Sequence, residues 1–139
     1  MLILDTNVVS ELMRPAPDAR VVSWVDSQPA SSQFITTITE AELRFGVAVL
    51  AAGQRKKRLG ELLEEMFRQE FAERILPFDR GAAAAYAPIV AGRRKAGQPI
   101  AQFDAQIAAV AASRGAAVVT RNEADFFDCG IEAINPWQA

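Results

Sequence analysis

This chain has no histidine among its 139 residues, so it lacks the side chain that most often moves protons near neutral pH. Its one cysteine, Cys129, cannot form an internal disulfide, and a reducing cytoplasm is the compartment that fits this composition. Without a histidine to activate it, Cys129 is expected to be an ordinary thiol. Any catalysis must therefore rely on carboxylates, amides and hydroxyls, with a metal ion as a natural addition.

Long apolar runs and a strong charge imbalance are also missing. No segment approaches the roughly 20 consecutive apolar residues that a membrane span needs. The first residues lack the basic region and the cleavage site of a signal peptide. The net charge of −2 means that any contact with nucleic acid would have to use local basic patches. No linker or repeat divides the chain, so we expect a single domain over residues 1–139.

Short apolar segments alternate with helical patterns along the chain. Strands are expected at Leu2–Asp5, within Ser31–Thr37, and at Ile75–Phe78, Ala117–Thr120 and Glu132–Ile134. Helices are expected at Asn7–Met13, Asp18–Asp26, Thr39–Ala52, Gln54–Phe71, Gly81–Lys95 and Ile100–Arg114, with a helical turn at Asp125–Phe127. This alternation predicts an α/β fold, a single α/β/α domain whose mostly parallel central sheet is flanked by helices.

Polar residues follow two of the predicted strands. Asp5 ends the first strand, and Asn122 and Asp125 come soon after the strand Ala117–Thr120. Open α/β sheets bind ligands at the carboxyl ends of their strands, and parallel strands place these ends on one edge. Asp5 and Asp125 are therefore either site residues or caps of the short helices that they precede.

Two further carboxylates lie within predicted helices. Glu42 either closes a capping box with Thr39 or lies at the rim of the core, since it shares a helix face with Phe45 and Val49. Asp104 falls on the apolar stripe of its helix, where an unpartnered carboxylate is costly to bury. The alternative for Asp104 is a surface acid that the helix dipole favours.

Acids that converge on one edge of a sheet have a definite chemical use. Carboxylates repel one another, and a hard divalent cation with oxygen ligands, such as Mg²⁺ or Mn²⁺, relieves that repulsion. Such an ion lowers the pKa of a bound water and neutralises the charge that builds on a phosphoryl oxygen. Hydrolysis of a phosphodiester bond is the reaction that this arrangement favours.

Five motifs, in order along the chain, resemble those of the PIN-domain ribonucleases. Within this family the chain is similar to the VapC-type toxins of type II toxin–antitoxin systems, on their FitB-like branch. The motifs are Leu4–Glu11, Ile38–Val47, Asp104–Ala109, Val119–Asn122 with Asp125 and Phe126, and Asn135–Trp137. The resemblance covers essentially the whole chain and implies a metal-dependent endoribonuclease that uses Mg²⁺ or Mn²⁺.

When the family's motifs are matched to this sequence residue by residue, the resemblance implies that the metal-binding catalytic acids are Asp5, Glu42 and Asp104. The fourth polar position of the family falls on Asn122, where some relatives carry an aspartate. Asn122 can coordinate through its carbonyl oxygen or orient a water, but it brings no charge. Asp125 is the alternative metal ligand, since it could supply the missing carboxylate.

Other polar residues are expected to support the site and its substrate. Three side chains would hold the acids by hydrogen bonds, namely Thr6, Asn7 and Thr120. Two basic runs offer a phosphate track for RNA, although a solvated helix end is the alternative for either run. The candidate RNA contacts are Arg44, Arg55, Lys56, Lys57, Arg58, Arg93 and Arg94.

The resemblance also implies partners. One is a small cognate antitoxin with a DNA-binding domain, whose tail covers the acidic cleft and whose arginine would displace the metal. The other is a second copy of the chain, in a homodimer within a larger complex. Candidate dimer surfaces are the Leu59–Phe71 helix and the first helix with Val8, Val9 and Leu12, with core packing as the alternative.

Two other functions compete with the nuclease. The amide at Asn122 favours a catalytically weak PIN module that acts mainly as a binding partner in a DNA-binding repressor complex, because fewer charges weaken metal binding. A receiver-like phosphoacceptor domain would need adjacent acids after the first strand and a lysine after a later one. Here Asp5 stands alone and Arg121 occupies the comparable place.

Overall fold

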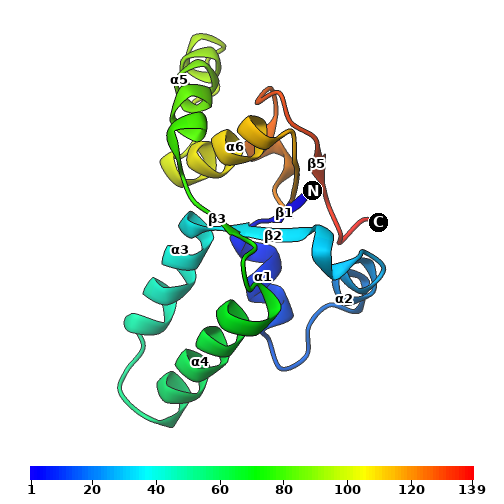
Figure 1. The fold of residues 1–139 in the computed structure, drawn as a ribbon, viewed down its shortest axis with the longest axis vertical. Coiled ribbons are helices and arrows are strands. Elements are labelled where there is room, and N and C mark those ends of the chain that lie inside the picture. The colour runs from blue at the N-terminus through cyan, green and yellow to red at the C-terminus, as the bar shows by residue number, and fades with distance from the viewer.

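Five short strands form the centre of the molecule, which the computed structural model describes over residues 1–139 (Figure 1). They are β1 (Leu2–Leu4), β2 (Gln33–Thr36), β3 (Ile75–Leu76), β4 (Ala117–Val119) and β5 (Ala133–Ile134). Their order in the sheet is β3-β2-β1-β4-β5, and all four pairings are parallel. The predicted α/β fold is therefore confirmed, with a sheet that is parallel throughout.

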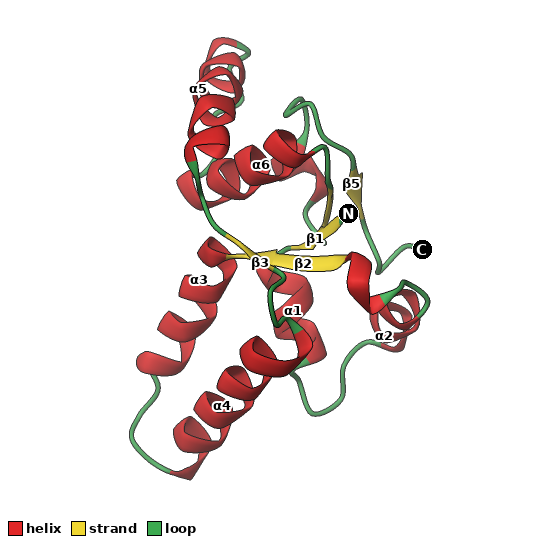
Figure 2. Ribbon diagram, in the orientation of Figure 1, coloured by secondary structure: helices red, strands yellow, loops and turns green.

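Helices cover both faces of this sheet (Figure 2). The α-helices are α1 (Thr6–Leu12), α2 (Ala19–Asp26), α3 (Thr37–Ala48), α4 (Gln54–Glu65), α5 (Arg80–Lys95) and α6 (Gln102–Arg114). Shorter helical segments are the 3₁₀ turns η1 (Ala30–Ser32) and η3 (Glu123–Phe126) and the π-helical segment η2 (Met66–Glu70). None of these helices combines the length and the apolar character that a membrane crossing requires.

The apolar character of β1 explains its place in the middle of the sheet. Leu2 pairs with Gln33 of β2 on one side and with Ala117 of β4 on the other. Successive side chains of a strand point to opposite faces, and Ile3 and Leu4 are both buried. A strand covered on both faces has to be apolar at consecutive positions, as this one is.

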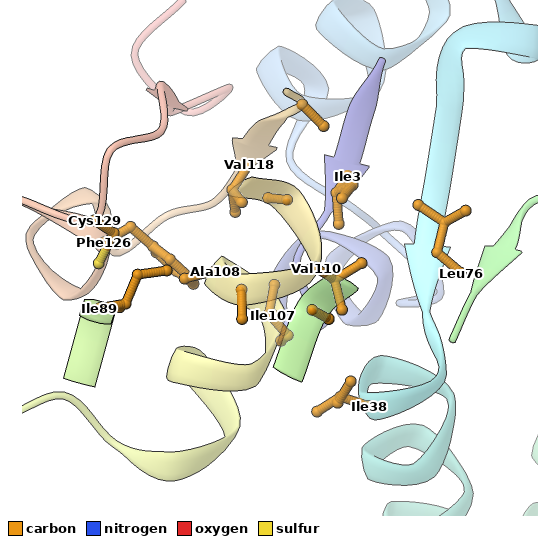
Figure 3. Packing of buried hydrophobic residues seen from close by; sticks show 14 residues of the cluster. Ile3, Ile38, Leu76, Ile89, Ile107, Ala108, Val110, Val118, Phe126 and Cys129 are labelled. Carbon is orange, nitrogen blue, oxygen red and sulfur yellow. The ribbon is translucent and has the colours of Figure 1, made fainter. Parts of the chain in front are cut away.

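Two hydrophobic clusters lie on the two sides of the sheet. On the side of α5 and α6, Ile3 and Val118 share a cluster with Ile107 and Val110 (Figure 3). On the other side, Leu4 packs in a second cluster to which α1, α2, α3 and α4 all contribute. The first helix buries Val8 and Val9 completely in that second cluster, so these two residues are not a dimer surface.

The start of α3 differs from the prediction, with a consequence for Glu42. The helix does not begin at Thr39, because Thr36 is its N-cap and accepts a hydrogen bond from the Thr39 N–H over 3.2 Å. The capping box expected between Thr39 and Glu42 is therefore absent. The helix also ends earlier than the predicted Ala52, at Ala48. Gly53 precedes α4 with a φ of 152°, which glycine adopts readily.

Candidate active site

One cleft gathers the acids that the sequence singled out. It has a volume of about 550 Å³, lies at the carboxyl ends of β1 and β4, and has no apolar lining residue. Its lining residues are Asp5, Thr6, Asn7, Ser10, Glu11, Arg14, Glu42, Asp104, Asn122 and Asp125. The structure thus brings together all three predicted catalytic acids and both candidates for the fourth position.

Asp5 is held from three sides. Its Oδ1 accepts a hydrogen bond from the Thr6 N–H over 2.8 Å. Its Oδ2 accepts from the Thr120 hydroxyl over 2.8 Å and from the Asn7 amide over 3.1 Å. With only 5% of its surface exposed, Asp5 is both the N-cap of α1 and a wall of the cleft, so the two alternatives for this residue are compatible.

Glu42 reaches the cleft from α3 and is oriented by Thr6. The Thr6 hydroxyl donates a hydrogen bond to Glu42 Oε1 over 2.8 Å, and it lies 3.0 Å from the hydroxyl of the fully buried Thr39. Thr39 was not foreseen in this role, although it precedes Glu42 by one helical turn, a spacing that places both on one face. Thr6 therefore links the cleft ends of α1 and α3.

The helix face that Glu42 shares is not part of the core. Phe45 and Val49 are 68% and 62% exposed, so the expectation that they bury this face is wrong. The reason is that α3 packs on the sheet side through Ile38 and Leu43, which are buried. Glu42 lies where the polar cleft meets an exposed apolar surface.

The acids raise one another's affinity for protons. Burial, followed by repulsion from Asp5, Asp125 and Glu42, raises the pKa of Asp104 to about 6. Burial also raises the pKa of Asp5, against the opposing hydrogen bonds from Thr120 and Thr6. None of these four carboxylates forms an ion pair with a lysine or arginine. The cleft therefore carries an excess of negative charge that the protein does not neutralise.

Both candidates for the fourth position line the cleft. The Asn122 N–H donates a hydrogen bond to the Thr120 hydroxyl over 3.1 Å, while the Asn122 side chain caps nothing. Asp125 lies in the first turn of η3 and does not cap it, so the cap alternative for this residue is wrong. Only Asp125 adds charge, and that charge acts on both Asp5 and Asp104.

The carboxylates of the cleft suit a divalent cation that keeps several bound waters better than one that is coordinated by protein ligands alone. No three acidic side chains close on a single point, so the cleft is not a finished cage of protein ligands. Mg²⁺ usually binds through one or two carboxylates and keeps several waters. Unpaired carboxylates that repel one another around an open cleft match that mode of binding, with Asp5, Glu42, Asp104 and Asp125 as the residues that would hold the ion.

Comparison with known proteins places this chain and its fold in a family. The PIN domain family profile matches residues 2–129. The chain belongs to the PIN domain family. This PIN domain is 45% identical over 137 residues to the toxin FitB of Neisseria gonorrhoeae and 41% identical over 138 residues to the VapC ribonuclease Y4jK of Sinorhizobium fredii. In both comparisons 99% of each chain is covered.

Solved structures agree with this assignment. The crystal structure of FitAcB from Neisseria gonorrhoeae matches this PIN domain with a TM-score of 0.94 and 45% identity, and the match covers both chains completely. The structure of FitAB bound to an IR36 DNA fragment matches with a TM-score of 0.93 and 44% identity, over 99% of this chain and 96% of the other. The predicted resemblance to the FitB-like branch is therefore confirmed.

Three cleft residues of this PIN domain were not foreseen, namely Ser10, Glu11 and Arg14. Glu11 is buried, accepts a hydrogen bond from the Asp18 N–H over 2.9 Å, and pairs with Arg14 over 3.3 Å. Its spacing of four residues from Asn7 on the same helix was a signal that could have placed it beside the site.

Three of the seven candidate RNA contacts are engaged within the protein. Arg93 is 6% exposed and donates to backbone carbonyls, so its assignment as an RNA contact is wrong. Arg44 pairs with glutamates on α3 and α4 and stacks on an aromatic ring, which neutralises its charge. Lys56 donates to a carbonyl at the end of α3 over 3.1 Å. Arg55, Lys57, Arg58 and Arg94 are exposed.

Proposed function

We propose that this PIN domain is the toxin of a toxin–antitoxin pair and an endoribonuclease that hydrolyses RNA phosphodiester bonds with Mg²⁺ or Mn²⁺. The observation that carries the proposal is the convergence of four carboxylates, none paired with a basic side chain, in one polar cleft. The names of its relatives, a toxin and a VapC ribonuclease, support the same activity. Such an enzyme would act on cytoplasmic RNA.

Each acid has a role that follows from its contacts. Asp5, whose oxygens are fixed by three donors, and Glu42, oriented by Thr6, would hold the ion in one place. Asp104 and Asp125 would also hold the ion, and the acids together would position the attacking water. A bound Mg²⁺ or Mn²⁺ supplies an activated water and neutralises charge on the phosphoryl oxygens. Asn122 offers an amide that can orient water or a phosphate oxygen.

A cationic groove suggests the path of the RNA strand. A second hollow of about 780 Å³ runs between α3 and α4 and shares Thr6, Ser10, Arg14 and Glu42 with the acidic cleft. Arg55 and Arg58 line this hollow at the start of α4. Cations at the positive end of a helix are disfavoured by its dipole, so an external use for their charge is the better explanation. We propose that they bind RNA phosphates.

The same groove suits an inhibitory partner. Apolar residues of both helices line the groove, namely Leu43 and Val47 of α3 and Leu59 and Leu62 of α4, and Leu62 is exposed. We propose that a small DNA-binding antitoxin lays its tail here and inserts an arginine among the cleft carboxylates, which would exclude the metal and the RNA together. A homodimer within the larger complex is part of the same proposal.

A direct test uses purified protein, free of antitoxin, and a mixed pool of structured RNAs in Mn²⁺, Mg²⁺ or EDTA. We expect cleavage that needs the metal and that disappears in Asp104→Asn. The matched control is Asp26→Asn, which makes the same chemical change at an exposed position outside the cleft and should leave cleavage intact. Cleavage that persists in EDTA, or that Asp104→Asn retains in full, would exclude the proposed chemistry.

One observation favours a second candidate function. Asn122, which lines the cleft just after β4, brings no charge, and fewer charges weaken metal binding. The chain would then act mainly as a binding module in a DNA-binding repressor complex, with the antitoxin contacting the DNA. Antitoxin binding that is retained by a folded protein without metal-dependent cleavage would support this second function.

A further inference from the structure

Arg93 is a buried cation without an acidic partner. Only 6% of it is exposed, and no carboxylate lies within ion-pair distance of its guanidinium. Its Nε donates a hydrogen bond to the Gln98 carbonyl over 2.6 Å, and its Nη1 donates to the carbonyls of Asp125 and Phe127 over 3.0 and 2.7 Å. Buried arginines are usually paired with acids, so this arrangement indicates a special use.

The carbonyls that Arg93 contacts lie in two separate segments of the chain. Each of these segments leads to or contains one acid of the cleft. Gln98 lies in the connection that leads into α6, whose first turn carries Asp104. Asp125 and Phe127 belong to the segment around η3. One guanidinium therefore connects the end of α5 to the approach to Asp104 and to the backbone of Asp125 itself.

Apart from the bonds from Arg93, the backbone of residues 123–129 is hydrogen-bonded only within this segment and to Asn122. It has no side-chain cap, most of its residues are exposed, and Asp128 has a left-handed φ of 56°. Its apolar anchors are Phe126 and Cys129, which share a cluster with Ile89, one helical turn before Arg93 on α5 (Figure 3). Phe126 and Cys129 hold the segment by apolar packing, whereas the hydrogen bonds from Arg93 hold its backbone.

We propose that Arg93 is a positioning residue of the acidic cleft, which holds the backbone at Asp125 and Phe127 so that the Asp125 carboxylate stays beside the other acids. The inference rests on the proposed function, because binding of a metal is what gives this position a purpose. The fork of the guanidinium explains why the residue is an arginine. It donates to Gln98 and to the η3 segment in two directions at once, which a lysine ammonium on a single flexible stem does not reproduce.

The test compares Arg93→Lys with Arg94→Lys, a matched control at the next residue, whose exposed side chain makes no hydrogen bond in the structure. Two quantities are measured on antitoxin-free protein, the hydrogen exchange of amides 121–130 and the dissociation constant for Mn²⁺. We expect Arg93→Lys to speed exchange in this segment about tenfold, with the sheet unchanged, and to weaken Mn²⁺ binding about fivefold. Arg94→Lys should change neither quantity.

A double variant separates positioning from a general loss of structure. Asp125→Asn alone should weaken Mn²⁺ binding, and adding Arg93→Lys to it should weaken binding little further, because Arg93 acts through Asp125. Unchanged exchange in residues 121–130 of Arg93→Lys, or a full additional loss of affinity in the double variant, would overturn the proposal. A wild-type protein that binds no Mn²⁺ would instead refute the proposed function, and the exchange measurement would still decide the role of Arg93.

Discussion

The Thr6 hydroxyl donates a hydrogen bond to Glu42 Oε1 over 2.8 Å, which joins two residues that lie 36 positions apart in the chain. The backbone N–H of the same threonine donates to Asp5 Oδ1, also over 2.8 Å. One residue therefore orients two of the four carboxylates. Thr6 therefore connects Asp5 and Glu42 through its own two hydrogen bonds.

Thr6→Val should loosen this arrangement while it keeps the shape and the backbone hydrogen bond. We expect Mn²⁺ binding to weaken by about tenfold, since groups that orient metal ligands contribute on that scale. The free energy of unfolding should fall by about 1 kcal/mol for the lost hydrogen bond. Titration with Mn²⁺ and denaturant unfolding measure both quantities. Thr6→Ser, which keeps the hydroxyl, should retain most of the affinity, and equal affinities for the two variants would contradict this role.

The stability of the metal-free protein should depend on the charge of Asp104. The pKa of Asp104 in the folded protein is about 6, above its ordinary value of 3.8, so the folded state binds this proton more tightly than the unfolded chain. The free energy of unfolding must therefore fall as the pH rises from about 4 to 6. Asp104→Asn removes this loss and should be more stable than wild type at pH 7.

The size of that effect is limited by solvent. At about 1.4 kcal/mol for each pKa unit, the rise from 3.8 to about 6 corresponds to about 3 kcal/mol. The partial exposure of Asp104 reduces this value, so we expect a gain of about 1 kcal/mol for Asp104→Asn at pH 7. The gain should vanish at pH 4. Denaturant unfolding in EDTA at both pH values measures it, with Asp26→Asn as the control. A constant difference between wild type and Asp104→Asn across this range would show that repulsion in the cleft is not its source.

Asn122→Asp should strengthen metal binding, because it adds a carboxylate to the lining of the cleft. An added ligand charge raises affinity for a divalent cation, and we expect the dissociation constant for Mn²⁺ to fall about tenfold. Calorimetric titration of both proteins measures the change. Binding that stays the same would indicate that Asp125 already supplies the fourth carboxylate fully and that position 122 does not face the ion.

Arg55 and Arg58 should contribute to RNA affinity in a manner that depends on salt. Each phosphate contact adds about 0.7 to the slope of log affinity against log salt for a single strand, so replacing both arginines with alanine should lower the slope by about 1.4. Binding to a non-cleavable RNA at several salt concentrations measures it. The control is Arg20→Ala on α2, since Arg20 is paired with Asp18 and lies outside the groove. An unchanged slope for the double variant would remove the groove from the RNA path.

The strand-end acids could be predicted from the sequence because their position follows from a short-range rule. Asp5 ends an apolar strand, and the parallel arrangement of β1 and β4 then determines that Thr120 and the residues after it lie beside it. Glu42 was harder to place. Its helix begins two residues earlier than expected. Phe45 and Val49 are apolar and share its helix face, which suggested that this face is buried, but both side chains are exposed.

Arg93 shows what the sequence could not supply. It stands in a basic run with Arg94 and Lys95 at the end of a helix, and side chains at adjacent helical positions point about 100° apart. One member of such a run can point inward, but the choice depends on where α6 and η3 pack against α5. That is a tertiary relationship between segments about 30 residues apart, such as Arg93 and Asp125, and no local pattern encodes it.

The central place of β1 also determines when during synthesis this cleft can exist. The Asp5 N–H donates to the Val119 carbonyl over 2.9 Å, and the Asp5 carboxylate depends on the Thr120 hydroxyl. The ribosome makes Asp5 almost at the start, whereas its partners emerge only when most of the chain has been translated. A nascent chain that has not reached β4 carries Asp5 and Glu42 without the scaffold that joins them to Thr120. Translation therefore completes the cleft late, and a chain interrupted before β4 lacks the contacts that assemble it.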